Sequence, residues 1–419
     1  MGAFVDLPRG WTVTRVDRVA TVRARIGWKA LTAAEYQPAG YAFLATPNIK
    51  PRDIDFENVN YISAYRYEES PELKLAVGDV LLAKDGNTLG ITNIVRQLPR
   101  PATVNGSIAV IRPFGILPGF LRYALAADVT QQSIAALKGG MGVPHLFQWD
   151  INRLPIPLPP VEQQRRIVKF LDAATERSAH LVAAHERLRE VVVRRRWSVF
   201  QSLLERVDAP LTPLRRMINF ITDGPFGSAF SSSDYSDTGA AVVRLGNIGF
   251  GEYRRRDQAF IPLDLYRNLL RHRVRAGDLL IAGLGDARNH AGRACVAPNL
   301  GPAIVKGKCF CARVNSRAAN AHFLSLLLSS PIGEQAMDSR GSTRAMINLD
   351  VVKSAVMPLP ELSEQARIVE AMRLADQLQT QVADVVARQE ALLAERQQAL
   401  ITAAVTGQVD VPTARGVAA

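Results

Sequence analysis

The sequence of 419 residues contains two copies of one pattern, about 200 residues apart. Five blocks recur in the same order at offsets of 199 to 201 residues: 31–40 with 230–239, Asn48-Ile49 with Asn247-Ile248, 77–83 with 276–282, positions in 101–112 with positions in 302–313, and 157–168 with 358–369. Chance matches do not keep one order and one offset over such a span. The period is far longer than the roughly 20 to 50 residues of solenoid repeats, so the chain must fold as two similar halves.

Each half combines short strand-like runs with helical stretches. Strands are expected at 41–44, 79–83 and 108–111, where apolar runs lie between Gly, Pro and Asn turn signals. Helical stretches follow at 120–136 and at 321–337. The sequence therefore predicts the α+β fold class, with two repeated mixed α/β domains.

A long helix is expected after the Pro-Leu-Pro sequence of each half. Roughly 40 residues there contain no Gly or Pro and place apolar residues at helical spacing. The expected apolar stripes are Ile167, Leu171, Ala174, Leu181, Leu188, Val192 and Val199 in the first helix and Ile368, Leu374, Leu378, Val382, Val385, Leu392 and Leu400 in the second.

Helices of this length, about 60 Å, are too long to cover one small domain and need a partner. We expect the two to pair as an antiparallel coiled coil that joins the domains. The alternative is that each helix packs on its own domain. The predicted divisions are 1–157 for the first domain, 158–206 for the central helix, 207–357 for the second domain, 358–408 for the C-terminal helix and 409–419 for a flexible tail.

The charge balance points to a polyanionic partner. Lys and Arg total 51 against 39 Asp and Glu, a net charge of +12, which is typical of nucleic-acid-binding proteins. Only nine of these 51 residues are lysine, so the base composition of the genome is an alternative explanation. The sequence has no stretch of 18 apolar residues and no secretory signal, so we expect a cytoplasmic protein without membrane contact.

Motifs of catalytic nucleic-acid enzymes are missing. The sequence contains no P-loop, no complete dinucleotide-binding glycine pattern and no Asn/Asp-Pro-Pro-Tyr/Phe tetrapeptide of amino-methyltransferases. Asp53 or Asp55 with Glu72 and Lys74 imitates the acidic set of metal-dependent nucleases, but the second half has no equivalent, and we interpret these residues as surface charges. The three cysteines follow no metal-ligand or disulfide pattern, so we expect buried thiols and no metal site.

These features resemble one family, the specificity (S) subunits of Type I restriction-modification systems. The resemblance rests on the Pro-Leu-Pro…Glu-Gln-x-Arg-Ile-Val start of each long helix at 157–168 and 358–369, on the ending at 395–408, on residues 221–228 and on the two Gly-Asp-[Val/Leu]-Leu blocks. It covers nearly the whole chain. The first helix departs from the pattern because it lacks the Ala-Val-Thr-Gly ending of the second.

The resemblance implies a subunit that specifies the DNA sequence and has no catalytic activity of its own. Each target recognition domain would bind one half of a bipartite, asymmetric site in double-stranded DNA, and the helices would space the domains and recruit methyltransferase (M) subunits. Adenine methylation with S-adenosylmethionine, and translocation and cleavage by restriction (R) subunits with ATP and Mg²⁺, would belong to other chains. The alternatives are an autonomous DNA methyltransferase or nuclease, and a coiled-coil scaffold that does not bind DNA.

Loops that differ between the halves are the candidates for DNA contact, because bases are read by side chains that reach the groove edges. Residues 84–88 follow the first Gly-Asp block, whereas the different residues 285–289 follow the second. The predicted DNA-binding residues are Lys84, Asn87, Thr88, Asn105, Lys138, Gln148, Arg244, Asn247, Arg288, Asn289, Arg293, Lys306, Lys308, Arg340 and Arg344.

Apolar helix residues outside the stripes predict where M subunits bind. They are Val191, Val193, Trp197, Phe200, Leu393 and Ile401. Trp197 is the expected anchor because Trp is enriched in interface hot spots, although it could instead fill the end of the coiled coil. Helix length should set the number of unspecified base pairs between the half-sites, and an insertion within 202–209 should change it.

Overall fold

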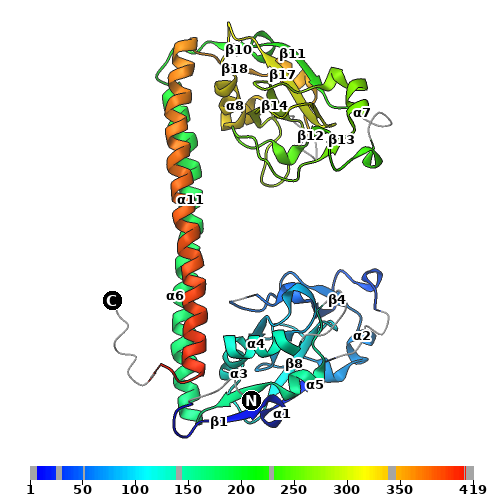
Figure 1. Cartoon of the computed structure of the whole chain (residues 1–419), viewed down its shortest axis with the longest axis vertical. Coiled ribbons are helices and arrows are strands. Elements are labelled where there is room, and N and C mark those ends of the chain that lie inside the picture. Colours follow the sequence, from blue (N-terminus) through cyan, green and yellow to red (C-terminus); the bar gives the residue numbers. More distant parts are fainter. Residues whose placement is uncertain are drawn as a thin grey trace. The chain divides into compact units, whose positions relative to one another are not determined.

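The computed structural model describes residues 7–24, 31–50, 52–137, 144–225, 231–337, 346–409 and 411. The chain divides into two compact units: Met1–Glu186 together with Val385–Ala419, and Arg187–Asp384. Each unit contains one mixed α/β domain and a part of both long helices (Figure 1).

The first unit contains the strands and short helices expected from the first half. Its strands are β1 (Thr12–Arg15), β2 (Ala20–Arg23), β3 (Tyr41–Leu44), β4 (Asn60–Ile62), β5 (Val80–Ala83), β6 (Thr92–Ile94), β7 (Ala102–Val104), β8 (Ile108–Pro113) and β9 (Pro155–Leu158). Its short helices are α1 (Val16–Val19), α2 (Ala64–Glu68), α3 (Pro118–Ala126), α4 (Asp128–Leu137) and α5 (Gln148–Arg153). The three expected strands are confirmed as β3, β5 and β8. The expected helical stretch is divided at Ala127, whose backbone is extended.

The second unit repeats these elements. Its strands are β10 (Leu211–Pro213), β11 (Ile218–Asp223), β12 (Ala240–Val243), β13 (Phe260–Ile261), β14 (Leu279–Ala282), β15 (Ala294–Val296), β16 (Ala303–Val305), β17 (Cys309–Val314) and β18 (Val356–Pro358). Its short helices are α7 (Leu263–Asn268), α8 (Ala321–Ser329), α9 (Pro331–Ala336) and α10 (Leu349–Ser354). The stretch expected at 321–337 is divided at Ser330, because Pro331 cannot continue a helix and starts a new one.

The sheet topology is the same in both units, which confirms the repeat. The first unit has sheets ordered β2-β8-β5-β6, β4-β3-β7 and β1-β9, and the second has β11-β17-β14-β15, β13-β12-β16 and β10-β18. In each three-stranded sheet one pair is parallel, β3 with β7 and β12 with β16. The four-stranded sheets are antiparallel, and helices α3 and α8 bury Phe120 and Phe323 beside them.

The Gly-Asp block shared by the halves builds the same turn twice. Gly78 has a φ of +93°, a left-handed conformation that favours glycine. The carboxylate of Asp79 accepts two hydrogen bonds of 2.7 Å from Arg112. In the second unit Asp278 lies 3.7 Å from Arg313. These residues match between the halves because they hold the common scaffold.

A buried glutamine fastens the start of each long helix to its domain. Gln164 accepts a hydrogen bond of 2.9 Å from the backbone amide of Leu117, and Gln365 accepts one of 2.7 Å from the amide of Asn320. Both side chains also donate to the carbonyl of the last proline in Pro-Leu-Pro, at 2.8 Å. The repeated Pro-Leu-Pro and Gln therefore form the joint between domain and helix.

The long helices are α6 (Val161–Leu204) and α11 (Leu362–Val405), of 44 residues each. Within the first unit Gln397 donates to Thr175 at 3.4 Å, and His185 lies 3.5 Å from Glu390. Within the second unit Arg196 forms an ion pair with Asp376. The paired positions rise along α6 as they fall along α11, so the helices are antiparallel, as expected.

The expected apolar stripe is wrong in part. Leu374, Leu378, Val385 and Leu392 of α11 are 47% to 64% exposed and do not face α6. The seam between the helices instead contains the polar pairs just described. Met372 packs in the core of the second unit, and Val386 is 2% exposed. Apolar spacing could not separate these two rows, because both repeat with the period of a helix.

Candidate nucleic-acid interface

The predicted DNA-binding residues fall into four groups in the structure. Exposed side chains are Asn87, Arg288 and Lys308; half-buried ones are Thr88, Gln148, Arg244, Asn289 and Lys306; buried ones are Lys84, Asn105, Asn247 and Arg293; and Lys138, Arg340 and Arg344 lie outside the described residues.

The buried group is bound within the scaffold. Lys84 pairs with Asp85 at 3.3 Å, and Asn105 accepts a hydrogen bond of 3.1 Å from the amide of Ser107. Asn247 accepts one of 2.8 Å from the amide of Arg244 and donates to nearby carbonyls. Buried side chains with satisfied hydrogen bonds do not reach a groove edge without rearrangement. The structure therefore gives these three a scaffold role, and they leave the set of candidate DNA contacts.

Arg293 positions two loops of the second domain, so it also leaves the set of candidate DNA contacts. The residue is 4% exposed, and its guanidinium donates to four backbone carbonyls at 2.9 to 3.1 Å: those of Leu245, Ile248, Leu284 and His290. Burial lowers the pKa of this arginine. The carbonyls belong to the loop after β12 and the loop between β14 and β15, so Arg293 fixes these two loops against each other.

In the first domain the predicted loop 84–88 lies beside residues 144–148, which include the predicted Gln148. Asp85 forms an isolated bridge and a side-chain hydrogen bond with His145, and the amide of Gly86 donates to the carbonyl of Pro144 at 2.9 Å. The side chain of Asn87 is exposed at the tip of this loop. Gln148 donates to the carbonyl of Val22 at 3.0 Å and so supports the end of β2.

An exposed aromatic pair in the first domain was missed by the sequence reasoning. Phe147 and Trp149 are 41% and 55% exposed, and their rings stack with centroids 6.1 Å apart. The guanidinium of Arg153 lies 5.5 Å from the Trp149 centroid. The aromatic residues at alternate positions, Phe147 and Trp149, were the sequence signal that could have identified this pair. Such a surface can pack on a base or on another protein.

The second domain gathers four predicted residues around one hollow, here called the basic pocket. It has a volume of about 520 Å³, and its lining includes Arg244, Asn247, Arg256, Asp257, Lys306 and Lys308. Arg256 was not predicted, although the run 254–256 of three arginines marked the segment. Concave surfaces rich in one sign of charge attract ligands of the opposite charge.

Local contacts orient the cationic groups of the basic pocket. Lys306 donates to the Tyr235 hydroxyl at 2.7 Å and lies 4.9 Å from that ring's centroid. Arg244 donates to the carbonyl of Asp257. Asp257 has a φ of +48° and is the only non-glycine residue with positive φ among those described. Such uncommon backbone conformations concentrate at functional sites.

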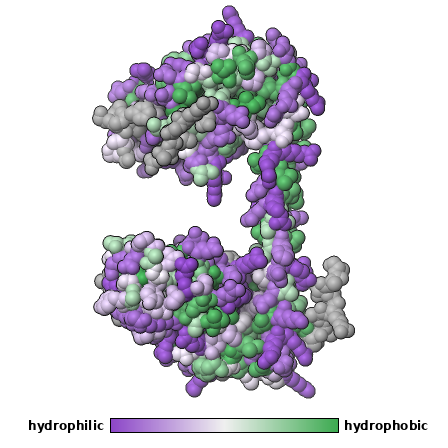
Figure 2. All heavy atoms as spheres, turned by 180° about the vertical axis from the view of Figure 1, so that it is seen from behind, coloured by the Kyte–Doolittle hydropathy of each residue, from purple (hydrophilic) through white to green (hydrophobic). Residues whose placement is uncertain are grey.

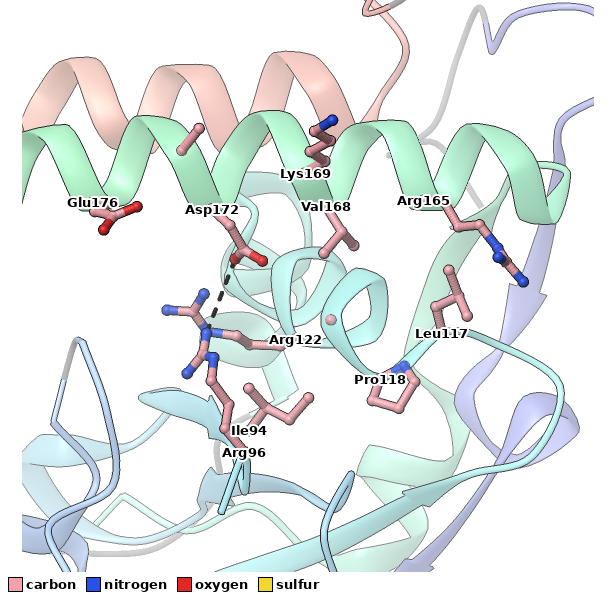
Figure 3. Close-up of a pocket in the computed structure, with 12 residues that line it drawn as sticks. Ile94, Arg96, Leu117, Pro118, Arg122, Arg165, Val168, Lys169, Asp172 and Glu176 are labelled. Atoms are coloured by element: carbon pink, nitrogen blue, oxygen red, sulfur yellow. Dashed lines mark ion pairs between the residues drawn. The ribbon is translucent and has the colours of Figure 1, made fainter.

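A separate groove of about 680 Å³ in the first unit lies between α6 and the domain. Figure 3 shows Arg96 and Arg122 reaching from the domain toward Asp172 of α6. Arg96 lies 4.0 Å from the Asp172 carboxylate, which also accepts a hydrogen bond of 2.6 Å from Tyr123. Burial lowers the pKa of Arg122. These contacts brace the domain against its helix, so the groove belongs to their joint.

The predicted partner-binding residues separate into two classes. Val191 and Val193 are 53% and 44% exposed, and Leu393 is half-buried. Phe200 and Ile401 are buried in the cores of the second and first units, which corrects their prediction as exposed residues. They are buried because the last turns of both helices pack against the domains. Trp197 is half-buried and packs edge-on against Phe200.

The long helices expose further apolar side chains. Leu181, Leu188 and Val191 on α6 are 42% to 53% exposed, in addition to the exposed row on α11. Figure 2 shows apolar patches interleaved with polar ones along the surface of the helix pair. Exposed apolar rows on paired helices are typical of a surface that receives another helix.

The described residues include no group of three or more His, Cys, Asp or Glu able to hold a metal ion. No helix in the described ranges has the length and apolar character needed to cross a membrane. The three cysteines are free and buried, as expected.

A family model described as "Type I restriction modification DNA specificity domain" matches residues 8–185 and 277–386. The match covers more than half of the chain and includes parts of both domains and both long helices. The chain belongs to this family. Members of this family supply the DNA specificity of Type I restriction-modification systems.

Curated specificity subunits are similar over most of their length. The specificity subunit of the Type I restriction enzyme EcoKI from Escherichia coli (strain K12) is 22% identical over 405 residues, which are 91% of this chain and 86% of that protein. That of StySPI from Salmonella potsdam is 21% identical over 412 residues, 92% of this chain and 87% of that protein.

A solved structure has the same fold. It is a chain from work on complex assembly and conformational transition of the type I R-M system, with a TM-score of 0.63 and 21% identity, and the match covers 97% of this chain and 100% of that chain. The predicted fold class is therefore confirmed, with two recognition domains and long paired helices.

Proposed function

We propose that this specificity subunit reads a bipartite, asymmetric target in double-stranded DNA, with each recognition domain contacting one half. One observation carries the proposal: a single scaffold occurs twice, yet its surface loops differ. Both domains keep the Gly-Asp turn and the Gln joint. The first domain presents Asn87 and an aromatic pair, whereas the second presents Arg288 and the basic pocket. Two domains with the same scaffold should dock on DNA in the same way, while the side chains that differ between them should contact different bases.

Methylation and cleavage would be the work of partner chains. Transfer of a methyl group from S-adenosylmethionine to adenine would occur on M subunits, and ATP- and Mg²⁺-dependent cleavage on R subunits. The test is to incubate the purified chain, M subunits and their mixture with duplex DNA and labelled S-adenosylmethionine. Sequence-specific methylation should need the mixture. Methylation or cutting by the chain alone would instead favour an autonomous enzyme.

The exposed apolar rows of α6 and α11 are the proposed docking surface for M subunits. Apolar side chains at positions such as Leu188 and Leu392 lie on the helices outside both domain cores. A partner helix packed there would extend the helix pair into a larger bundle and bury these side chains. Trp197 is not needed as the anchor, because its ring packs on the core of the second unit.

A coiled-coil scaffold without DNA contact is the remaining alternative. It would leave the +12 charge and the four cationic groups of the basic pocket without a ligand. A gel-shift experiment with M subunits present separates the two, because a scaffold would shift no duplex.

A further inference from the structure

The basic pocket draws its positive charge from three chain segments. Arg244 follows β12, Arg256 precedes β13, and Lys306 and Lys308 lie in the turn between β16 and β17. Asp257 is the only carboxylate among the described lining residues. Residues far apart in the sequence thus converge on one hollow with a large excess of cationic groups.

The cations at the rim are available to an external anion. The neighbouring Arg254 pairs with Glu252 at 3.3 Å. By contrast, Arg256 and Lys308 are exposed and have no ion pair with any carboxylate in the described part of the chain. Arg244 is held by a backbone carbonyl rather than by a carboxylate, so its charge is not neutralised there. Phosphate oxygens suit such donors because arginine and lysine form strong charge-assisted hydrogen bonds with them.

The backbone around the pocket is closely packed and fixed. A Cβ at Gly224 would lie 2.2 Å from the amide nitrogen of Gly307, so only glycine allows this approach. Arg293 binds the carbonyl of Leu245 at 3.1 Å and holds the opposite side. The cationic groups therefore project from a preformed frame, which reduces the entropy lost on binding.

The first domain does not repeat this charge. Ala45, Glu57, Asn105 and Ser107 occupy the positions that correspond to Arg244, Arg256, Lys306 and Lys308. None of these four is cationic, and Asn105 is buried. The scaffold alone thus does not require cations here, and the basic pocket is a property of the second domain.

We propose that the basic pocket binds a backbone phosphate of duplex DNA and gives the second recognition domain a larger share of the salt-dependent affinity than the first. This inference rests on the proposed DNA function. The contact positions the duplex and carries no base information, because all sequences have the same phosphates.

The test measures the salt dependence of binding by the full chain assembled with its M subunits. A labelled duplex of mixed sequence is titrated by fluorescence anisotropy from about 50 to about 200 mM salt. Each phosphate contact contributes about 0.9 to the slope of log K against log salt. The double variant Arg256→Gln/Lys308→Gln should therefore lose up to about 0.9 from the slope and bind every duplex roughly tenfold more weakly at low salt.

Arg215→Gln/Arg216→Gln is the matched control, because it removes two exposed charges outside the basic pocket. Its slope should stay close to that of the unmodified complex. If the pocket variant kept the original slope, or if the control lost as much, the inference would be overturned while the DNA function stood. A complex that bound no duplex at all would overturn both.

A second arm separates a DNA phosphate from a free phosphate. Inorganic pyrophosphate, with chloride matching the ionic strength, should bind the unmodified complex only weakly in calorimetry. Tight pyrophosphate binding that the double variant abolishes, with an unchanged duplex slope, would assign the pocket to a small phosphate ligand and reject the inference.

Discussion

Gln164 and Gln365 show how single residues define the architecture. Each side chain is at most 1% exposed and joins a backbone amide of its domain to the carbonyl of a proline that precedes its helix. Without the side chain, these backbone groups would be left buried and unpaired, which is costly. The repeated glutamine is therefore a structural element of the joint.

Gln164→Ala and Gln365→Ala should each destabilise their unit by about 1–3 kcal/mol, because two backbone groups lose their partners. Gln201→Ala on the same helix as Gln164 is the control, since Gln201 is exposed and bonds only to Glu205 among described residues. Thermal unfolding and hydrogen exchange of the Leu117 amide would check this. Equal stability of Gln164→Ala and the control would show that the joint does not depend on this side chain.

The buried thiols predict a pH dependence at the alkaline end. Burial raises the pKa of Cys295 and of Cys309 to about 12, whereas an unfolded thiol titrates near about 8.5. The folded state thus favours the neutral thiol, and this stabilisation is complete below about pH 8.5 and is lost as the pH rises toward 12.

Between about pH 9 and 11, each such thiol should steepen the loss of stability by up to about 1.4 kcal/mol per pH unit. In denaturant titrations, Cys309→Ala should make the unfolding free energy fall less steeply with rising pH than it does in the unmodified chain. Ellman's reagent should label the thiols only after unfolding. Rapid labelling of the native chain, or parallel stability curves, would contradict the assignment.

At the scale of the helices, the polar seam and the exposed apolar rows have different tasks. Contacts such as the ion pair of Arg196 with Asp376 hold α6 against α11, while Leu378 and Leu392 remain 56% and 64% exposed. Exposed positions tolerate polar side chains with little effect on stability. The rows are therefore available to bind a partner.

Leu378→Glu/Leu392→Glu should leave the unfolding free energy within about 0.5 kcal/mol and abolish co-purification of M subunits. Val386→Glu is the contrasting variant, because Val386 is 2% exposed and a buried carboxylate should destabilise the helix pair. If M subunits still co-purified in full yield with the Leu378→Glu/Leu392→Glu chain, docking on the exposed rows would be rejected.

The sequence predicted where the strands and long helices lie better than it predicted which of their side chains are buried. The repeat and the Gly-Pro punctuation identified β3, β5, β8 and both long helices. Periodicity could not tell the row of Leu378 from that of Val386, because both recur at helical spacing. Nor could it show that Arg293 is buried, since its four carbonyl partners lie in separate loops. Asn247 was predicted to contact DNA, although its match to Asn48 in the first half already indicated a structural role common to both domains.

At the scale of the whole molecule, α6 and α11 are the continuous elements that connect the two domains. Adding seven residues to each helix, after Glu186 and before Val385, keeps the helical register and adds about 10 Å, or about three base pairs of B-DNA. The methylated target should then gain about three unspecified base pairs while both half-site sequences stay the same. A spacer that did not change would reject the helices as the determinant of spacing.

Methylome sequencing of cells that carry this chain and its M subunits tests the central claim most directly. We predict adenine methylation at an asymmetric motif with two specified parts separated by unspecified bases, and loss of that motif when the chain is deleted. Exchange of residues 207–357 for the corresponding domain of another specificity subunit should alter one part only. Methylation confined to uninterrupted palindromes, or unchanged after deletion of the chain, would contradict the account.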